Sequence, residues 1–487
     1  MKTLIFCALL AISGAVHAEP RQYISDHQGV FGGQQIRYRA IVQEHLVPGA
    51  DGKPAASVFT MTYLRTGLKP AQGVERPVIF AFNGGPGSAA IWLHMGFLGP
   101  QRVDAGEPGK PNTLPPFRYV PNDDSPLDVA DIVLIDPPGT GYSRMLEGAA
   151  PQFYAVDSDA QMTVGLIREW ALRHGRLNSP KFLVSESYGT VRAAVVAKLL
   201  AGGPMTTGRM DGIGLNGVVL LGQAMDFSGE GGDLRYLAAL PTMAATACLH
   251  GKGPASCTSA GQADAARAFA RDTLLPALYA GNRLDPATRS KVAGELAALT
   301  GLERQEVLDR NLRVSLGEYS KLLLRTEGRR IGLYDARYTL ALAGAGSDPV
   351  ADDPAMGQYV PAYVGAWSDY ARRELGIDLA EPYEAISFRT VNGQWDYGFG
   401  PGVPFGRNFA ADLATAMNHN PNLRVMIGTG YYDLVTTIGA AEYTAAHVAM
   451  PPDRVVFHEY ESGHMPYLGD ASRRQLAADI RHFVTGR

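Results

Sequence analysis

The chain has 487 residues, 46% of them hydrophobic, which is enough for about two to four globular domains. Its formal net charge is −4 without a long run of one sign, so the composition does not favour binding to nucleic acid or to an anionic membrane surface. The histidines, cysteines and acidic residues show no metal-ligand spacing, and we expect neither a metal nor another cofactor.

Residues 1–18 have the pattern of a signal peptide. Lys2 supplies a positive start, residues 4–16 are apolar but too short to cross a membrane, and Ala18 is small enough for the cleavage position. We predict cleavage after Ala18 and export to the periplasm or the medium. No later stretch reaches the roughly 18 apolar residues of a spanning helix, so no membrane anchor is expected.

The chain continues with alternating patterns and then with buried strands. Residues 29–42 alternate around a Gly-Gly turn, as in a β-hairpin, and residues 57–64 alternate as well. Helix patterns over residues 158–174 and 190–200 alternate with apolar runs, which predicts a mostly parallel, doubly wound α/β sheet. The apolar runs, each typical of a strand covered on both faces, span residues 77–82, 131–136, 181–184 and 216–222.

Helix patterns dominate residues 226–408, and the clearest cover residues 287–299, 304–314 and 316–326. We interpret this stretch as a helical cap inserted over the C-terminal edge of the sheet, where the functional site is expected. The strand pattern then returns, and a final helix ends the chain. The predicted organisation is therefore a first core part over residues 19–225, the cap over residues 226–408, and a second core part over residues 409–487.

Two cysteines lie outside the predicted signal peptide. Cys248 and Cys257 enclose a loop-like stretch, and an even cysteine count in an exported protein argues for a disulfide. The alternative is a pair of free, buried thiols.

The string Ser185-Glu186-Ser187-Tyr188-Gly189 joins a predicted strand to a predicted helix. A strand, a tight turn centred on serine and a helix form the setting of a nucleophile elbow, whose usual string is G-x-S-x-G. Here Ser185 replaces the first glycine. Strings of this kind are common in loops, so the assignment of Ser187 as a nucleophile depends on other stretches of the chain.

A serine nucleophile needs a base, and the base needs a carboxylate that fixes its tautomer. In the elbow-type fold the chain order is Ser, acid, His. Asp433 follows the predicted strand at residues 423–428, and His464 lies in a Gly-flanked loop after the strand at residues 454–460. Two alternatives stay open, since Asp433 could cap a helix and His464 could be a solvated surface residue.

The string Asn83-Gly84-Gly85-Pro86-Gly87-Ser88 follows the buried strand at residues 77–82. Glycines let the backbone approach a substrate, and an oxyanion hole needs backbone N–H donors. We assign one donor to the N–H of Gly85 and the other to the N–H of Tyr188. The alternative is a plain turn. A phosphate loop is excluded because the terminal Gly-Lys-Ser/Thr is missing.

Together these residues resemble the serine carboxypeptidase family of the α/β-hydrolase fold. The resemblance implies the release of C-terminal residues from peptides with a free C-terminus, through an acyl-enzyme. By position, Ser187 is then the nucleophile, His464 the base and Asp433 its orienting partner. The signal peptide and the composition fit a bacterial exported member. The matching strings are Asn83-Gly84-Gly85-Pro86-Gly87, Leu98-Gly99-Pro100, residues 136–143, Glu186-Ser187-Tyr188-Gly189, residues 430–433 and Gly463-His464-Met465.

The resemblance also implies that Asn83, Gly84 and Glu186 hold the carboxylate of the substrate. A carboxyl group binds a carboxylate well only when one of the two is protonated, so Glu186 needs a raised pKa. Phe97 stands where the family usually has a second Glu paired with the first. The pair that shares a proton is therefore missing, which leaves the recognition of the free C-terminus and the pH optimum open.

Two other functions remain open. An esterase, an amidase or an acyltransferase could use the same triad, and its substrates would need no free carboxylate. A non-catalytic binding protein would be expected to lack a member of the triad, whereas Ser187, Asp433 and His464 are all present.

Overall fold

The structure, a computed structural model, describes residues 19–149, 152–205, 208, 210–228, 232–401 and 406–486. The predicted signal peptide lies outside these residues. Within the described ranges, no helix is both long enough and apolar enough to cross a membrane.

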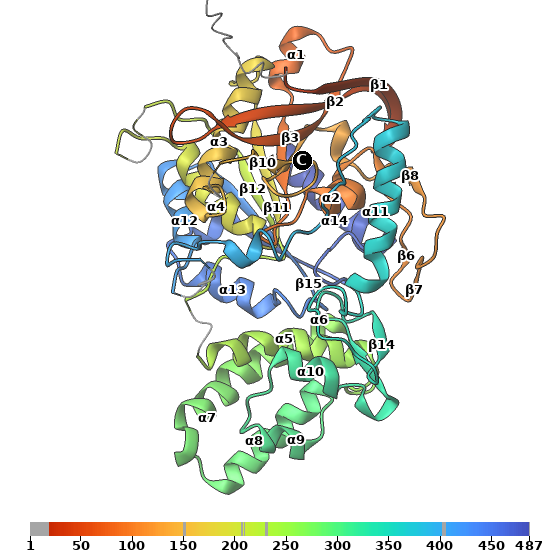
Figure 1. Ribbon diagram of the computed structural model, residues 1–487. Helices are drawn as coiled ribbons and strands as arrows, with labels where there is room; N and C mark the ends of the chain where they lie inside the picture. Colours follow the sequence, from red (N-terminus) through yellow and green to blue (C-terminus); the bar gives the residue numbers. More distant parts are fainter. Residues whose placement is uncertain are drawn as a thin grey trace, which may run out of the picture.

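A ten-stranded sheet forms the centre of the molecule, in the order β1-β2-β3-β9-β4-β11-β12-β15-β16, with β10 paired to β3 (Figure 1). The strands from β9 through β16 along this order run parallel, whereas β1, β2 and β3 pair antiparallel with one another and with β9. The strands are β1 (Gln22–Phe31), β2 (Gln34–Pro48), β3 (Pro54–Arg65), β4 (Val78–Phe82), β9 (Asp131–Asp136), β10 (Arg144–Met145), β11 (Lys181–Glu186), β12 (Gly217–Leu221), β15 (Arg424–Gly430) and β16 (Val455–Tyr460).

The sequence explains why the central strands lie in the middle of this sheet. Every residue of β4, β9, β11 and β12 is buried, as expected for the continuous apolar runs from which they were predicted. By contrast, β1 alternates between exposed and half-buried residues, because one face of this edge strand meets solvent.

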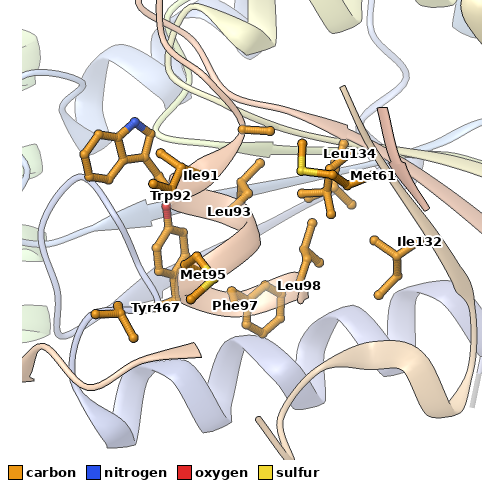
Figure 2. Packing of buried hydrophobic residues seen from close by; sticks show 14 of the residues in the cluster. Met61, Ile91, Trp92, Leu93, Met95, Phe97, Leu98, Ile132, Leu134 and Tyr467 are labelled. Atoms are coloured by element: carbon orange, nitrogen blue, oxygen red, sulfur yellow. The ribbon is translucent and has the colours of Figure 1, made fainter. Parts of the chain in front are cut away.

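Helices cover both faces of the sheet, and each face has its own buried cluster. On one face lie α3 (Val156–Arg173), α4 (Gly189–Leu200), α12 (Ala410–His419) and α13 (Ile438–Ala446), which contribute to one cluster. On the other face lie α2 (Ile91–Leu93), the π-helical turn η1 (His94–Leu98), α11 (Met356–Arg373) and α14 (Asp470–Thr485). Figure 2 shows the buried side chains of α2 and η1 packed together with residues of the sheet. The architecture is the α/β-hydrolase fold expected from the sequence.

A separate group of helices lies beyond the end of the sheet, at the bottom of Figure 1. These helices enclose a third buried cluster, to which Tyr431, Tyr432 and Leu434 of the loop after β15 also belong. The group therefore packs directly on the loop that carries Asp433. The helices are α5 (Leu234–Leu249), α6 (Ser259–Phe269), α7 (Leu275–Ala280), α8 (Pro286–Thr300), α9 (Arg304–Asp309) and α10 (Leu316–Leu322).

Several details of the predicted cap differ from the pattern in the sequence. The helix expected over residues 316–326 ends at Leu322. The helix expected over residues 304–314 ends at Asp309, and Asn311 and Leu312 then take positive φ angles of 52° and 67°. A turn with two left-handed residues cannot continue a helix. In addition, α11 packs on the sheet and not with the other cap helices. The boundaries at residues 226 and 408 remain a prediction.

The remaining elements connect these layers. They include the short helix α1 (Pro70–Glu75) and three two-stranded sheets. The small sheets pair β5 (Gln101–Val103) with β8 (Tyr119–Pro121), β6 (Gly106–Glu107) with β7 (Lys110–Pro111), and β13 (Arg329–Ile331) with β14 (Thr339–Ala341).

Candidate active site

Ser187 occupies a sharp turn between β11 and α4. Its φ angle is +59°, a left-handed conformation that costs energy in a residue with a side chain. The turn is held from both sides, because the Ser187 N–H donates to the carbonyl of Leu221 at 2.9 Å and the Ser187 carbonyl accepts from the Thr190 N–H at 2.9 Å. Its neighbours on either side are buried, whereas Ser187 is half-buried. This strained turn has the geometry of a nucleophile elbow.

The glycine loop after β4 lies directly against this turn. A Cβ atom on Gly84 would stand 2.8 Å from the Ser187 Cβ atom and 2.5 Å from the Tyr188 backbone nitrogen. Only glycine allows the two loops to approach so closely. In the described part of the chain, the backbone N–H groups of Gly85 and Tyr188 donate to no protein acceptor.

His464 and Asp433 come together from the loops that follow β16 and β15, two neighbouring parallel strands. The His464 Nδ1–H donates to Asp433 Oδ2 at 2.9 Å. The other carboxylate oxygen, Oδ1, accepts from the N–H groups of Val435 at 2.8 Å and Thr436 at 2.9 Å, and the Thr436 hydroxyl donates to Oδ2. Asp433 is fully buried, so these bonds fix its orientation. His464 keeps its Nε2 atom as the acceptor in this tautomer.

The electrostatic setting of His464 favours its protonated form. Burial alone would lower the pKa of the ring, but the charge and the hydrogen bond of Asp433 raise the pKa above its ordinary value. Glycine also makes room for the ring, because a Cβ atom on Gly222, which has a φ angle of +54°, would stand 3.1 Å from His464 Nδ1.

Ser187 and His464 line one cavity of about 50 Å³, although no hydrogen bond joins them among the described contacts. In enzymes without bound substrate such a contact is often long. Most of the wall is apolar or aromatic. The lining residues are Asn83, Gly84, Gly85, Ser88, Trp92, Glu186, Ser187, Tyr334, Met356, Tyr359, Ile386, Phe388, His464 and Met465.

Glu186 is a buried acid in this cavity. Asn83 Nδ2 donates to Glu186 Oε1 at 2.8 Å, and Asn83 Oδ1 accepts from the Leu93 N–H at 3.0 Å, which fixes the amide. Burial raises the pKa of Glu186 to about 7, while the charge of His464 and hydrogen bonding with Tyr467 and Asn83 act in the opposite direction. The structure thus brings together all the residues that the sequence suggested for catalysis and for carboxylate binding.

Phe97 is fully buried in η1, and its ring stacks on that of Tyr467 with 6.2 Å between the centroids. At the position of the missing second Glu, Phe97 therefore makes an aromatic contact with Tyr467. Tyr467 itself was not expected to contribute to the site, since a tyrosine three residues after the candidate base carries no recognisable signal.

A buried ion pair beneath the site was also missed. Arg192 Nε lies 2.6 Å from Asp159 Oδ2, and both side chains are almost completely buried. Arg192 Nη1 donates to the Asn83 carbonyl at 2.8 Å, so the pair supports the glycine loop from below. A signal was present, because Arg192 is the only charged residue in the run of residues 191–197.

The predicted disulfide is present, and it joins Cys248 at the end of α5 to Cys257 just before α6, with a Cα–Cα distance of 5.9 Å. Among the residues that the structure describes, no group of three or more His, Cys, Asp or Glu side chains could hold a metal ion.

The comparison with protein families agrees with the motifs. Residues 63–227, which include the glycine loop and the elbow, match the family model described as serine carboxypeptidase. The family match and the fold support a serine hydrolase. No curated protein matches the chain significantly.

The solved structures that are similar to this chain include several hydrolases. Kex1, a prohormone-processing carboxypeptidase from Saccharomyces cerevisiae, shares 13% identity with a TM-score of 0.55, covering 91% of this chain and 90% of the other. A thermostable carboxyl esterase from Bacillus coagulans shares 11% identity with a TM-score of 0.38, covering 91% and 98%. At these identities the likeness to Kex1 supports the fold alone, and the esterase, with its lower score, adds no argument.

Proposed function

We propose that the chain is a serine-type carboxypeptidase that releases C-terminal residues from peptides. The proposal rests on three features that meet at one cavity. They are the strained Ser187 turn, the His464–Asp433 pair and the buried Glu186. The family match over residues 63–227 supports the same reaction class.

In this mechanism the Ser187 hydroxyl oxygen attacks the carbonyl carbon of the last peptide bond, while His464 Nε2 takes the hydroxyl proton. The backbone N–H groups of Gly85 and Tyr188 stabilise the oxyanion that forms. The C–N bond then breaks, and His464 returns the proton to the leaving amine. Water, activated by His464, hydrolyses the acyl-enzyme on Ser187. Asp433 holds the ring in the required tautomer and stabilises its charged form.

Asn83, Gly84 and Glu186 hold the terminal carboxylate of the substrate. A protonated Glu186 can donate to this carboxylate, whereas an ionised one repels it, and the raised pKa keeps Glu186 protonated up to neutral pH. The disulfide fits a protein that is exported to the periplasm or the medium.

A second candidate is an esterase, amidase or acyltransferase with the same triad. The observation that favours it is Phe97, because the site has an aromatic contact where the family pairs two carboxyl groups.

The proposal is tested by mass spectrometry of one peptide supplied with a free C-terminus and with an amidated C-terminus. A carboxypeptidase removes residues stepwise from the free acid and not from the amide, and Ser187→Ala, which removes the nucleophile, abolishes the cleavage. Equal action on the amide, or ester hydrolysis without peptide cleavage, would favour the second candidate.

A further inference from the structure

The carboxyl group of Glu186 has one oxygen without a partner. Oε1 accepts from Asn83, whereas Oε2 is buried and has no hydrogen-bond partner among the residues that the structure describes. A buried carboxyl oxygen without a partner costs free energy, and the cost is greater when the group is charged. The groups that surround Oε2 therefore determine whether Glu186 holds a proton.

Tyr467 provides such a group. It follows His464 by three residues, its side chain is 2% exposed, and its hydroxyl also lacks a partner of ordinary hydrogen-bond geometry within the described chain. The hydroxyl nevertheless lies close enough to Glu186 for hydrogen bonding to lower the pKa of the acid. Two buried polar groups without a hydrogen-bond partner, one an acceptor and one a donor, thus lie near each other.

The packing around Tyr467 holds its ring in this place. Figure 2 shows Tyr467 among the buried side chains of α2 and η1, next to Met95 and Phe97. The ring stacks on Phe97, with an angle of 14° between the planes. A Cβ atom on Gly96 would stand 2.6 Å from Cδ2 of the Tyr467 ring, even closer to its Cε2, and 2.7 Å from the hydroxyl of Tyr363. Gly96 therefore creates the space that the two tyrosines fill.

We propose that Tyr467 is a positioning residue of the Glu186 subsite, in the place of a second carboxyl group. Its hydroxyl donates a hydrogen bond to Glu186 Oε2 and thereby orients the carboxyl group. The other side of Oε2, with the proton that Glu186 shares with the substrate, then faces the carboxylate of the substrate. This inference rests on the proposed function, because it assumes that Glu186 meets a carboxylate.

A tyrosine has a different effect on Glu186 from that of a carboxyl group. A second carboxylate would repel the charge of Glu186 and raise its pKa further, whereas a hydroxyl donor stabilises the ionised form. A subsite with Tyr467 therefore loses its proton at a lower pH than the same subsite without this hydroxyl.

Several other groups face this pair. Glu186 also meets His464, which lowers its pKa, and Asp433, which raises it, besides the amide of Asn83. Tyr363 lies close to both members of the pair. Tyr467 and Tyr363 also line a second cavity of about 200 Å³. The charged residues of this cavity are Arg102, Asp104, Glu107, Asp470 and Arg473.

The test compares Tyr467→Phe with Tyr338→Phe, a matched control. Tyr338 is also buried, also has a hydroxyl without a partner in the described chain, and belongs to the same buried cluster, but it is not one of the main groups that shift the pKa of Glu186. KM and kcat/KM are measured against pH with a free-acid peptide. In parallel, the Glu186 side-chain carboxyl carbon is titrated by NMR, with its signal assigned by its loss in Glu186→Gln.

We expect Tyr467→Phe to raise the pKa of Glu186 by at least about 0.5 unit, because a hydrogen bond to the ionised form is lost. The rise of KM at alkaline pH moves upward by the same amount, while Tyr338→Phe matches the wild type. An unchanged Glu186 titration in folded Tyr467→Phe, or an equal shift in Tyr338→Phe, overturns the inference. If the free acid is not cleaved but the NMR shift is present, the proposed function fails and the pairing of Tyr467 with Glu186 stands.

Discussion

His464 Nδ1 lies 2.9 Å from Asp433 Oδ2, and both side chains are buried at the carboxyl ends of two adjacent parallel strands. Three further donors hold Asp433, from the backbone of Val435 and from the backbone and hydroxyl of Thr436. A carboxylate held so firmly fixes the ring and its tautomer, which is the function that a serine hydrolase needs from its acid.

Replacing Asp433 by Asn should lower kcat by about 10²- to 10⁴-fold while KM changes little, because the amide favours the wrong tautomer of His464. Steady-state kinetics at neutral pH measure this effect, and circular dichroism confirms folding. The matched control is Asp412→Asn, which removes a buried carboxylate paired with Lys198 and Arg407. The assignment is contradicted if Asp433→Asn keeps more than about a tenth of the wild-type kcat, which lies outside that range.

The buried Glu186 should make the binding of free-acid peptides depend on pH. With a pKa of about 7, Glu186 is protonated below this pH and ionised above it, so KM should rise as the pH increases beyond about 7. Glu186→Gln keeps a neutral donor at all pH values and should abolish this rise.

The measurement is KM and kcat for one free-acid peptide between about pH 4.5 and pH 9, which brackets the shifted pKa values. An ester substrate without a carboxylate serves as the control, and its KM should show no such rise. If the KM of the free acid rises equally in wild type and Glu186→Gln, another group is responsible and the assignment of Glu186 is wrong.

The cavity lining should select apolar side chains next to the scissile bond. Apart from Glu186 and His464, its described lining residues are uncharged, and they include Trp92, Met356 and Phe388. A charged side chain buried here would lack a partner. The test uses two peptide series, one varying only the last residue and one varying only the penultimate residue. At one of the two positions, Lys or Asp should lower kcat/KM at least tenfold relative to Leu, which corresponds to about 1.4 kcal/mol of transition-state stabilisation. Full tolerance of Lys and Asp at both positions would contradict this expectation.

The disulfide should contribute to stability more than to activity. It closes a loop with a sequence separation of 9, and the loop-entropy estimate for such a short loop is about 2–3 kcal/mol. Denaturant unfolding of a Cys248→Ala/Cys257→Ala double variant should show a loss of this size, with kcat/KM close to the wild type. A stable double variant without activity would show instead that the bond positions the catalytic loops.

The central strands and the catalytic loops could be predicted because their signals are local. Continuous apolar runs identified β4 and β11. The glycine-rich string after β4 identified the loop at Gly84, and the Ser-x-Ser-x-Gly string after β11 identified the turn at Ser187. The contact with Ser187 requires a Gly at position 84, whereas the sequence had suggested only that the glycines let the backbone approach a substrate.

Other features depend on contacts between distant segments and left no such trace. The sequence could not show whether α11 packs on the sheet or on the other cap helices, since either arrangement buries an apolar face of the helix. The departure at Phe97 was visible, but the stacking of its ring on Tyr467 joins residues 370 positions apart. The role inferred for Tyr467 therefore required the folded chain.

Trapping of the acyl-enzyme would show whether Ser187 attacks the last peptide bond. A peptide whose final bond is an ester to a hydroxy acid with a free carboxylate should acylate the enzyme faster than water releases it. Rapid acid quenching and intact-protein mass spectrometry should show an added mass equal to that of the peptide without its last residue, less one water. Peptide mapping should place the adduct on Ser187, and Ser187→Ala should carry none. An adduct on another residue, or turnover by Ser187→Ala at the wild-type rate, would contradict the account.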